Sequence, residues 1–361
     1  MKKHYLLILL IFPAVLFAQK KVDLDRFNFK VQFRSFPDMR IDSTYRTYNV
    51  LVSNSKLMEH FMKDLEPASS VILQGWRKLP QEGHININVK LEDLLPESVS
   101  VKERVVNITN RAGAITGTNK LYYQEVVYTF AAVAQINDYK GAHIMDQVLA
   151  DRGYKQVYKS PEFSLRGIAE GYFILNSATI TKDLYRSCVT RAMHYLSSRI
   201  TDNFGYGEAT VNDYMWVVGS KKHPEYDDYR KVFRDMNEVL FSMTANNSIE
   251  GAREKLKPVI DYFEKIKTDY CSSKKHDCKI RYASYFNLAV LYYYLDDPEM
   301  MMKEANGLIL NDYKTAVGKS FQESALRLKN QFQRTNIYTR HFSIDPSTFK
   351  GPLENTETVV K

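Results

Sequence analysis

Two stretches of the chain have the residue types and spacing of a hydrolytic nucleophile. The Ser-x-x-Lys spacing of penicillin-recognising enzymes occurs at Ser53 and Lys56, and again at Ser272 and Lys275. Neither stretch is accompanied by the Ser-Asp-Asn or Lys-Thr-Gly motif of those enzymes, and the chain has no Gly-x-Ser-x-Gly elbow. We therefore interpret both stretches as polar loops. The sequence predicts no catalytic residue and a protein that is not an enzyme.

A third stretch has side chains that can bind zinc. Cys271, His276 and Cys278 lie close together, and thiolate and imidazole are preferred zinc ligands. No fourth ligand with the usual spacing is adjacent, so we favour a disulfide between Cys271 and Cys278 over free thiols or a metal site. Cys188 is then the odd cysteine, and we expect it to be buried on a helix. The sequence predicts no metal and no cofactor.

The first nineteen residues predict the compartment. Lys2 and Lys3 form a positive segment, residues 5–17 are almost wholly apolar, and Ala18 and Gln19 end the run. This pattern is typical of a secretory signal peptide over residues 1–19 and is too short for a transmembrane helix. Because no cysteine lies near the cleavage point, we expect no lipid anchor, and we expect no transmembrane segment later. The sequence predicts an exported protein, periplasmic or peripherally associated with the outer membrane.

The composition is that of a folded, weakly basic protein. Hydrophobic residues make up 44% of the chain and charged residues 25%, as in an ordinary globular protein. Removing Lys2 and Lys3 with the signal lowers the formal charge from +8 to +6, and the remaining Lys and Arg are scattered. We therefore expect a solvated basic surface and no nucleic-acid partner.

The first half of the chain has the pattern of β-strands. Apolar and polar residues alternate over 27–33 and 85–91, which indicates strands with one buried face. Further strands are expected at 47–52, 71–76, 101–108 and 122–136, a hairpin turn at 137–141 leading to 143–148, a mobile loop at 111–119 and a short helix at 57–65. We interpret this half as an antiparallel β-rich domain, either a sandwich or a curled sheet.

The second half has helical periodicity. Apolar residues recur every four positions from Leu184 to Phe204, which places them on one helix face. A returning strand is expected at 208–218, and further helices at 226–243, 249–263, 282–295, 299–310 and 320–332. The predicted fold class is α+β. The predicted parts are a signal peptide at 1–19, a β-rich domain at 20–155, a connecting region at 156–222, a helical region at 223–335 and a flexible tail at 336–361.

The helical region resembles the tetratricopeptide repeat family over about residues 225–332. One unit carries the resemblance through Tyr285, Asn287-Leu288-Ala289, Tyr292, the turn Asp296-Asp297-Pro298, Ala305 and Leu308. Met301 stands where the family usually has Ala, and Asp296 where it usually has Gly. The resemblance implies stacked helix pairs that offer a docking surface. The signal sequence and the Tyr-rich, Asn-rich and Lys-rich body also resemble exported proteins of Bacteroidota-type bacteria.

Aromatic residues make up 13% of the chain and supply the candidate binding residues. An interaction face is predicted at Tyr285, Tyr292, Tyr293 and Tyr294. We predict an exported, non-enzymatic interaction subunit, an accessory component of a complex that assembles or exports outer-membrane proteins, with other envelope proteins as partners. The alternative is a glycan-binding envelope protein in which Trp76 and Trp216 stack on sugar rings. A third hypothesis is an envelope hydrolase with dispersed carboxylates.

Overall fold

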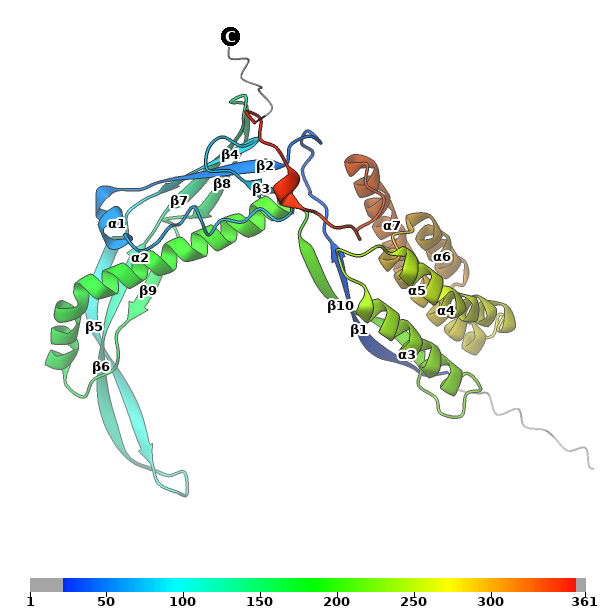
Figure 1. Ribbon diagram of the computed structural model, residues 1–361. Helices are drawn as coiled ribbons and strands as arrows, with labels where there is room; N and C mark the ends of the chain where they lie inside the picture. The colour runs from blue at the N-terminus through cyan, green and yellow to red at the C-terminus, as the bar shows by residue number, and fades with distance from the viewer. Residues whose placement is uncertain (1–21, 355–361) are drawn as a thin grey trace, which may run out of the picture. The chain divides into compact units, whose positions relative to one another are not determined.

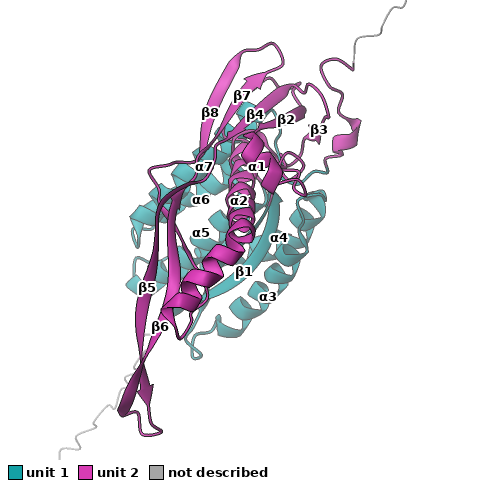
Figure 2. Cartoon of the chain, turned by 90° about the vertical axis from the view of Figure 1, so that its left-hand side faces the viewer, with its two compact units in different colours: residues 1–34, 209–343 teal, residues 35–208, 344–361 magenta. Residues whose placement is uncertain are grey.

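The computed structural model describes residues 22–354, so the predicted signal peptide at 1–19 lies outside the described residues. The described residues combine strands and helices, which confirms the α+β class (Figure 1). They form two compact units, coloured separately in Figure 2. Unit 1 contains residues 22–34 and 209–343, and unit 2 contains residues 35–208 and 344–354.

Unit 2 is built on a mixed sheet with the strand order β3-β2-β4-β7-β8. Its strands are β2 (Thr47–Ser53), β3 (Arg77–Lys78), β4 (Ile85–Leu91), β7 (Ala132–Asp138) and β8 (His143–Ala150). β2 runs parallel to both neighbours, whereas β4, β7 and β8 pair antiparallel, so the sheet is not the purely antiparallel one expected. The reason is the connection from β2 to β4, which passes through α1 (Lys56–Phe61) instead of a hairpin turn.

The core of unit 2 lies between this sheet and α2 (Arg166–Phe204). Ile85, Ile87 and Val89 on β4 are buried in one cluster with residues of the second half of α2, such as Val189 and Leu196. The apolar residues that recur every two positions on β4 and every four positions on α2 are therefore the two sides of one buried interface. The unit is therefore a sheet packed on a helix and not a sandwich.

A second sheet of unit 2 has the order β5-β6-β9. Its strands are β5 (Leu95–Thr109), β6 (Ile115–Thr129) and β9 (Gln156–Lys159). The single strand expected at 122–136 is divided between β6 and β7. The mobile loop expected at 111–119 is instead a hydrogen-bonded turn and the start of β6, because the Asn110 side chain accepts from the Ala112 and Ala114 amides at 3.0 Å. The strand expected at 71–76 is absent from the described chain, where an irregular segment at 71–73 leads into a turn at 74–75.

Unit 1 pairs two strands and adds a run of helices. Its elements are β1 (Leu24–Arg34), β10 (Glu208–Val218), α3 (Tyr226–Ser242), α4 (Glu250–Asp269), α5 (Lys275–Tyr294), α6 (Pro298–Leu310) and α7 (Thr315–Thr335). Each helix packs on the next, and β1 packs on α3 and α5. The chain is thus divided differently from the expected domains 20–155 and 156–222. β1 belongs with the helices because its buried Phe29 and Val31 join the helical core.

Three helices of unit 1 are followed by a polar residue in left-handed backbone conformation. Asp296, Asp312 and Asn336 have φ values of 55°, 51° and 54°. After α5, the Asp297 amide donates to the Tyr292 carbonyl at 2.9 Å, which satisfies a free carbonyl of the last turn. Asp296 therefore adopts the backbone conformation that is usually found at glycine, and its carboxylate makes a separate contact with the C-terminal segment.

That contact is with the segment that the sequence predicted to be a flexible tail. The Asp296 carboxylate accepts from the Arg340 amide and from Arg340 Nε, both at 2.6 Å, and both side chains are buried. The Arg340 guanidinium also lies 4.3 Å from the Phe33 ring centroid and 4.4 Å from that of Tyr293. The prediction of a flexible tail is therefore wrong for residues 336–354, and residues 355–361 lie outside the described part.

We predict that Arg340→Met lowers the free energy of unfolding by about 3–5 kcal/mol, because it leaves the buried Asp296 carboxylate without its cation. Urea denaturation measures the change. The matched control is Lys329→Met, which removes an exposed ion pair of 2.7 Å with Glu299 and should cost much less, because solvent screens an exposed pair. Equal losses from both variants would contradict the role given to Arg340.

We also predict that His341 makes the protein less stable in mild acid. Its Nδ1 lies 2.8 Å from the Thr244 carbonyl and its side chain is buried, and this burial lowers the pKa of His341 below its usual range, with Arg340 and Asp296 nearby. The unfolded chain then binds a proton more readily than the folded chain, so stability falls as the pH drops below about 6.5. His341→Asn should reduce that fall between pH 7 and about pH 5.5 in urea denaturation. An unchanged pH profile would refute the assignment.

Candidate interaction site

The first half of α2 exposes an unusual amount of apolar surface. Ile174 is 71% exposed and Leu175 86% exposed, and Leu165 and Ile168 are also exposed. Only Ala169 and Ile180 of residues 166–184 are buried, whereas the second half of the helix buries a residue in every turn. The helix is therefore a core element at one end and a surface element at the other.

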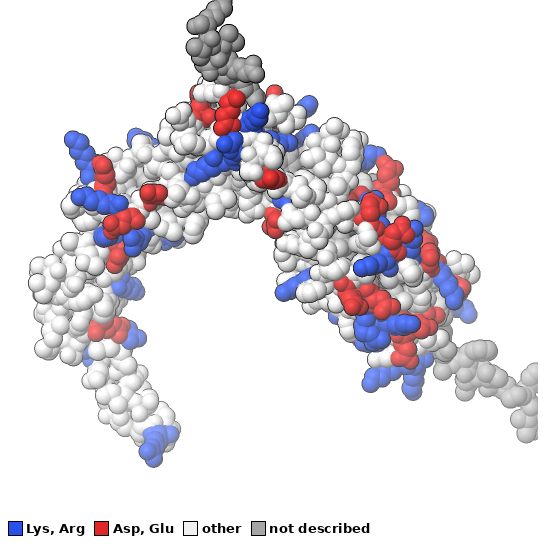
Figure 3. Space-filling model, in the orientation of Figure 1, with Lys and Arg blue, Asp and Glu red and all other residues white. Residues whose placement is uncertain are grey.

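The backbone of α2 is also accessible on this face. Gly167, Gly171 and Ile174 lie on one side of the helix because they are spaced by four and three residues. A Cβ added at Gly167 or Gly171 would meet nothing within 4 Å. Residues 171–181 contain no charged side chain, and the region around the start of α2 is largely white in Figure 3. A partner can therefore approach this helix closely and without displacing an ion.

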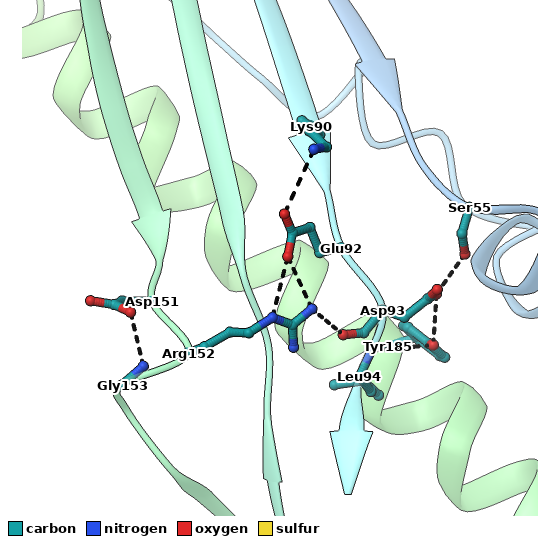
Figure 4. Close-up of polar contacts among 9 residues, drawn as sticks. All are labelled: Ser55, Lys90, Glu92, Asp93, Leu94, Asp151, Arg152, Gly153 and Tyr185. Carbon is teal, nitrogen blue, oxygen red and sulfur yellow. Dashed lines mark hydrogen bonds and ion pairs between the residues drawn. The ribbon is translucent and has the colours of Figure 1, made fainter.

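A polar cluster fixes the junction from which β5 and α2 extend (Figure 4). Between β4 and β5, Glu92 accepts from Arg152 Nε at 3.2 Å and from Nη2 at 3.1 Å, and Nη2 also donates to the Asp93 carbonyl. The Asp93 carboxylate accepts from Ser55 Oγ at 2.5 Å and from the Tyr185 hydroxyl at 3.1 Å. This cluster joins the two sheets of unit 2 to α1 and α2.

Tyr185 is the buried member of this cluster. Its hydroxyl accepts from the Leu94 amide at 3.3 Å, and its side chain is 1% exposed. Burial, with a smaller contribution from the Asp93 carboxylate, raises the pKa of Tyr185 to about 12. The hydroxyl is therefore neutral at any physiological pH and acts as a fixed donor to Asp93.

A second candidate surface is the open edge of β2. β3 pairs only with Thr47 and Tyr48, so within residues 22–354 the rest of β2 has no strand on that side. A hollow of about 990 Å³ lies along this edge, with Val50, Val52, Met62, Leu65 and Leu79 among its lining residues. An unpaired edge of this kind is a template for an added strand.

The two tryptophans predicted to stack on sugars do not present an exposed ring face to a ligand. Trp76 is 4% exposed, and its indole Nε1 donates to the Phe204 carbonyl at 2.9 Å, so its assignment as a glycan platform is wrong. Trp216 is half-buried among Tyr214, Tyr282 and Phe286, and the Arg26 guanidinium lies 5.1 Å from its ring. Neither ring offers a free flat face of the expected kind.

The predicted tyrosine face is divided between the core and the surface. Tyr292 and Tyr294 are buried, and the Tyr294 hydroxyl donates to Asp213 at 2.7 Å. Tyr285 and Tyr293 are half-buried and lie against Lys267 and Arg340. Successive residues of a helix point about 100° apart, so Tyr292, Tyr293 and Tyr294 cannot share one face. The prediction is wrong for the two buried tyrosines.

The other predicted reactive residues take structural roles. Cys271 and Cys278 are free thiols in the structure, as is the buried Cys188, so the favoured disulfide is not formed there. Cys278 lies in the first turn of α5, where the Arg281 guanidinium donates to its sulfur at 3.3 Å. Ser53 donates to the Val89 carbonyl at 3.2 Å and Ser272 to the Asp277 carboxylate at 2.5 Å. Among residues 22–354, no group of His, Cys, Asp and Glu is arranged to hold a metal ion.

Comparisons with known proteins identify no family, so the functional argument rests on the geometry of the structure. The chain matches no protein-family model and no curated protein. In the described part of the chain, no helix combines the length and apolar character needed to cross a bilayer. Sequence reasoning missed the exposed half of α2, although the charge-free run at 171–181 with adjacent Ile174 and Leu175 was a usable signal.

We predict that Tyr185→Phe lowers the free energy of unfolding by about 1–3 kcal/mol, because Asp93 loses a donor and the Leu94 amide loses an acceptor in a buried site. Urea denaturation measures the loss. The matched control is Tyr195→Phe, which removes the hydroxyl from a 45% exposed side chain on the same helix and should change stability by less than about 0.5 kcal/mol. If the two variants behave alike, the cluster does not stabilise the junction.

Proposed function

We propose that this protein is an exported interaction subunit without enzymatic activity, an accessory component of a complex that assembles or exports outer-membrane proteins. The observation that carries the proposal is the exposed, charge-free face of α2 around Gly171, Ile174 and Leu175. Apolar residues exposed next to one another on a rigid helix are typical of a surface that a partner covers. The export signal in residues 1–19 supports an envelope protein as that partner.

The partner element that fits this face is a helix. Gly167 and Gly171 leave the backbone of α2 open, so a second helix can approach closely, with Ile174 and Leu175 packing beside the contact. The Arg166–Glu170 ion pair of 3.1 Å lies at the start of the face and leaves the following turns neutral. A neutral, apolar helix face on the partner is the complement of this surface.

The helices of unit 1 supply a second docking surface in this proposal. We infer that α3 with α4, and α5 with α6, form tetratricopeptide-like pairs closed by α7, supported by short connections and by close packing of α5 on α6. A Cβ at Gly307 would lie 2.2 Å from the Tyr285 ring, and Ala289 and Ala305 are fully buried. Small residues at such contacts are what the family resemblance implies.

The glycan-binding alternative gains no support from the predicted residues, because Trp76 is buried and Trp216 is enclosed by other aromatic rings. The hydrolase hypothesis, which rests on dispersed carboxylates, likewise gains no specific support from the two serines: the Ser53 hydroxyl donates to the Val89 carbonyl and the Ser272 hydroxyl to the Asp277 carboxylate. The exposed face of α2 is therefore the feature on which the proposal is tested.

We predict that a photo-crosslinking amino acid at position 175, in cells that make the full chain, gives one discrete adduct with an envelope protein. Ile174→Gln in the same chain should lower the adduct yield about tenfold, because a buried apolar contact of this size contributes about 1.4 kcal/mol or more to binding. Mass spectrometry identifies the adduct and gel densitometry measures its yield.

The control position is Tyr154, which is 75% exposed against 86% for Leu175 and lies in the bend between β8 and β9, outside both proposed docking surfaces. Position 154 should give no such adduct. Equal adducts from both positions would show random collision and contradict the proposal. An adduct with twice the mass of the chain would assign the face to a second copy and would also contradict it.

A further inference from the structure

The end of the β5–β6 hairpin is a two-stranded ribbon that no other described element of unit 2 covers. β9 pairs with β6 only over residues 125–128, and the next contact toward the turn is the bridge between Tyr122 and Phe163. Beyond it, residues 105–119 pair only with one another. We call these residues the ribbon end; Figure 1 shows it extending beyond α2 and β9 within unit 2.

Apolar side chains of the ribbon end face solvent. Ile115 is 61% exposed, Val105 is 55% exposed and Ile108 is 46% exposed. Gly117 stands opposite Ile108 and offers it no side chain to pack against. The turn itself adds Ala112 and Ala114 and is held by Asn110, with Gly113 at a φ of 80° that only glycine adopts freely. The exposed apolar side chains therefore lie on the two strands that flank a defined, hydrogen-bonded turn.

The charge of the ribbon end has one sign. The chain has no Asp or Glu between Glu103 and Glu125, and Arg111 at the turn is the only charged residue among 105–119. Arg104 and Lys120, at the base of this segment, pair with Glu162 at 2.7 Å and Glu103 at 2.9 Å. Arg111 has no ion pair within residues 22–354. Figure 3 shows the ribbon white with blue at its end.

We propose that the ribbon end binds an anionic lipid surface. Exposed Ile side chains beside a lone cation, on an acid-free turn, complement a membrane interface in which apolar chains lie beneath negative headgroups. A protein partner is the alternative outcome of the test below. The open strand edges restrict the contact to headgroup depth, where water still satisfies the backbone.

This contact is separate from the α2 face and does not depend on the proposed function. Through this contact the protein binds the membrane directly, in addition to any attachment through a protein partner. Asn107 and Thr109 flank Ile108 along β5, and Thr116 follows Ile115 along β6, so polar side chains that can bond to headgroups lie next to the two isoleucines that insert.

The test is co-sedimentation of the full chain with vesicles of phosphatidylcholine containing about one third phosphatidylglycerol, against vesicles of phosphatidylcholine alone. We expect binding to the anionic vesicles only. Arg111→Gln should weaken it about fivefold, the effect of about 1 kcal/mol for one basic residue at such a surface. Ile108→Asn combined with Ile115→Asn should weaken it about tenfold or more. Thermal unfolding checks that the variants fold.

Two controls keep the outcome specific. Lys319→Gln removes an exposed cation from α7, and Leu175→Gln removes the exposed side chain of the α2 face; both should bind vesicles like the original chain. Every variant carries the same residues 1–19, so binding through that apolar segment would persist in all of them. Binding that the ribbon variants do not change, or no binding at all, overturns the proposal. A photo-crosslinker at position 115 that captures a protein without vesicle binding overturns it in favour of a protein partner.

Discussion

The contact of Arg152 with Glu92 and Asp93 is the constraint on which unit 2 depends. β4 ends at Leu91 and β5 begins at Leu95, so the chain leaves one sheet and enters another within three residues. The backbone of such a link needs fixed partners, and it has them in Arg152 and in the Tyr185 hydroxyl. Through Ser55 and Tyr185 the same cluster ties α1 and α2 to the link.

The α2 face and the ribbon end are both extensions of elements anchored at this link. The second half of α2 is buried against the sheet, and the first half continues as a rigid helix with Ile174 and Leu175 exposed. β5 likewise starts beside the cluster, and its hairpin with β6 continues past β9 as a free ribbon. Regular hydrogen bonding within a helix or a hairpin lets each element hold its shape beyond the core that anchors it.

Local pattern in the sequence predicted most of the elements. The alternation at 85–91, the four-residue period at 184–204 and the turn at 137–141 all correspond to observed elements, because each reports burial on one side of a single element. Three features could not be predicted from local pattern: the parallel pairing of β2, the packing of β1 with the helices, and the fixed structure of the segment around Arg340. Each depends on a contact between residues far apart in the chain, such as the 2.6 Å bond from Arg340 Nε to Asp296.

The sequence alone therefore determined the α+β class, the span of most helices and strands, and the acid-free character of the ribbon end. Only the tertiary structure decided which apolar residues were covered. Leu175 and Leu196 lie on the same helix, yet one is 86% exposed and the other fully buried. The burial of Trp76, and the buried ion pair that holds Arg340 of the predicted tail, likewise depend on residues distant in the sequence. The physical reason is that a side chain is buried only where another part of the chain packs against it. When that part is distant in the sequence, the residues around the side chain carry no pattern that predicts the contact.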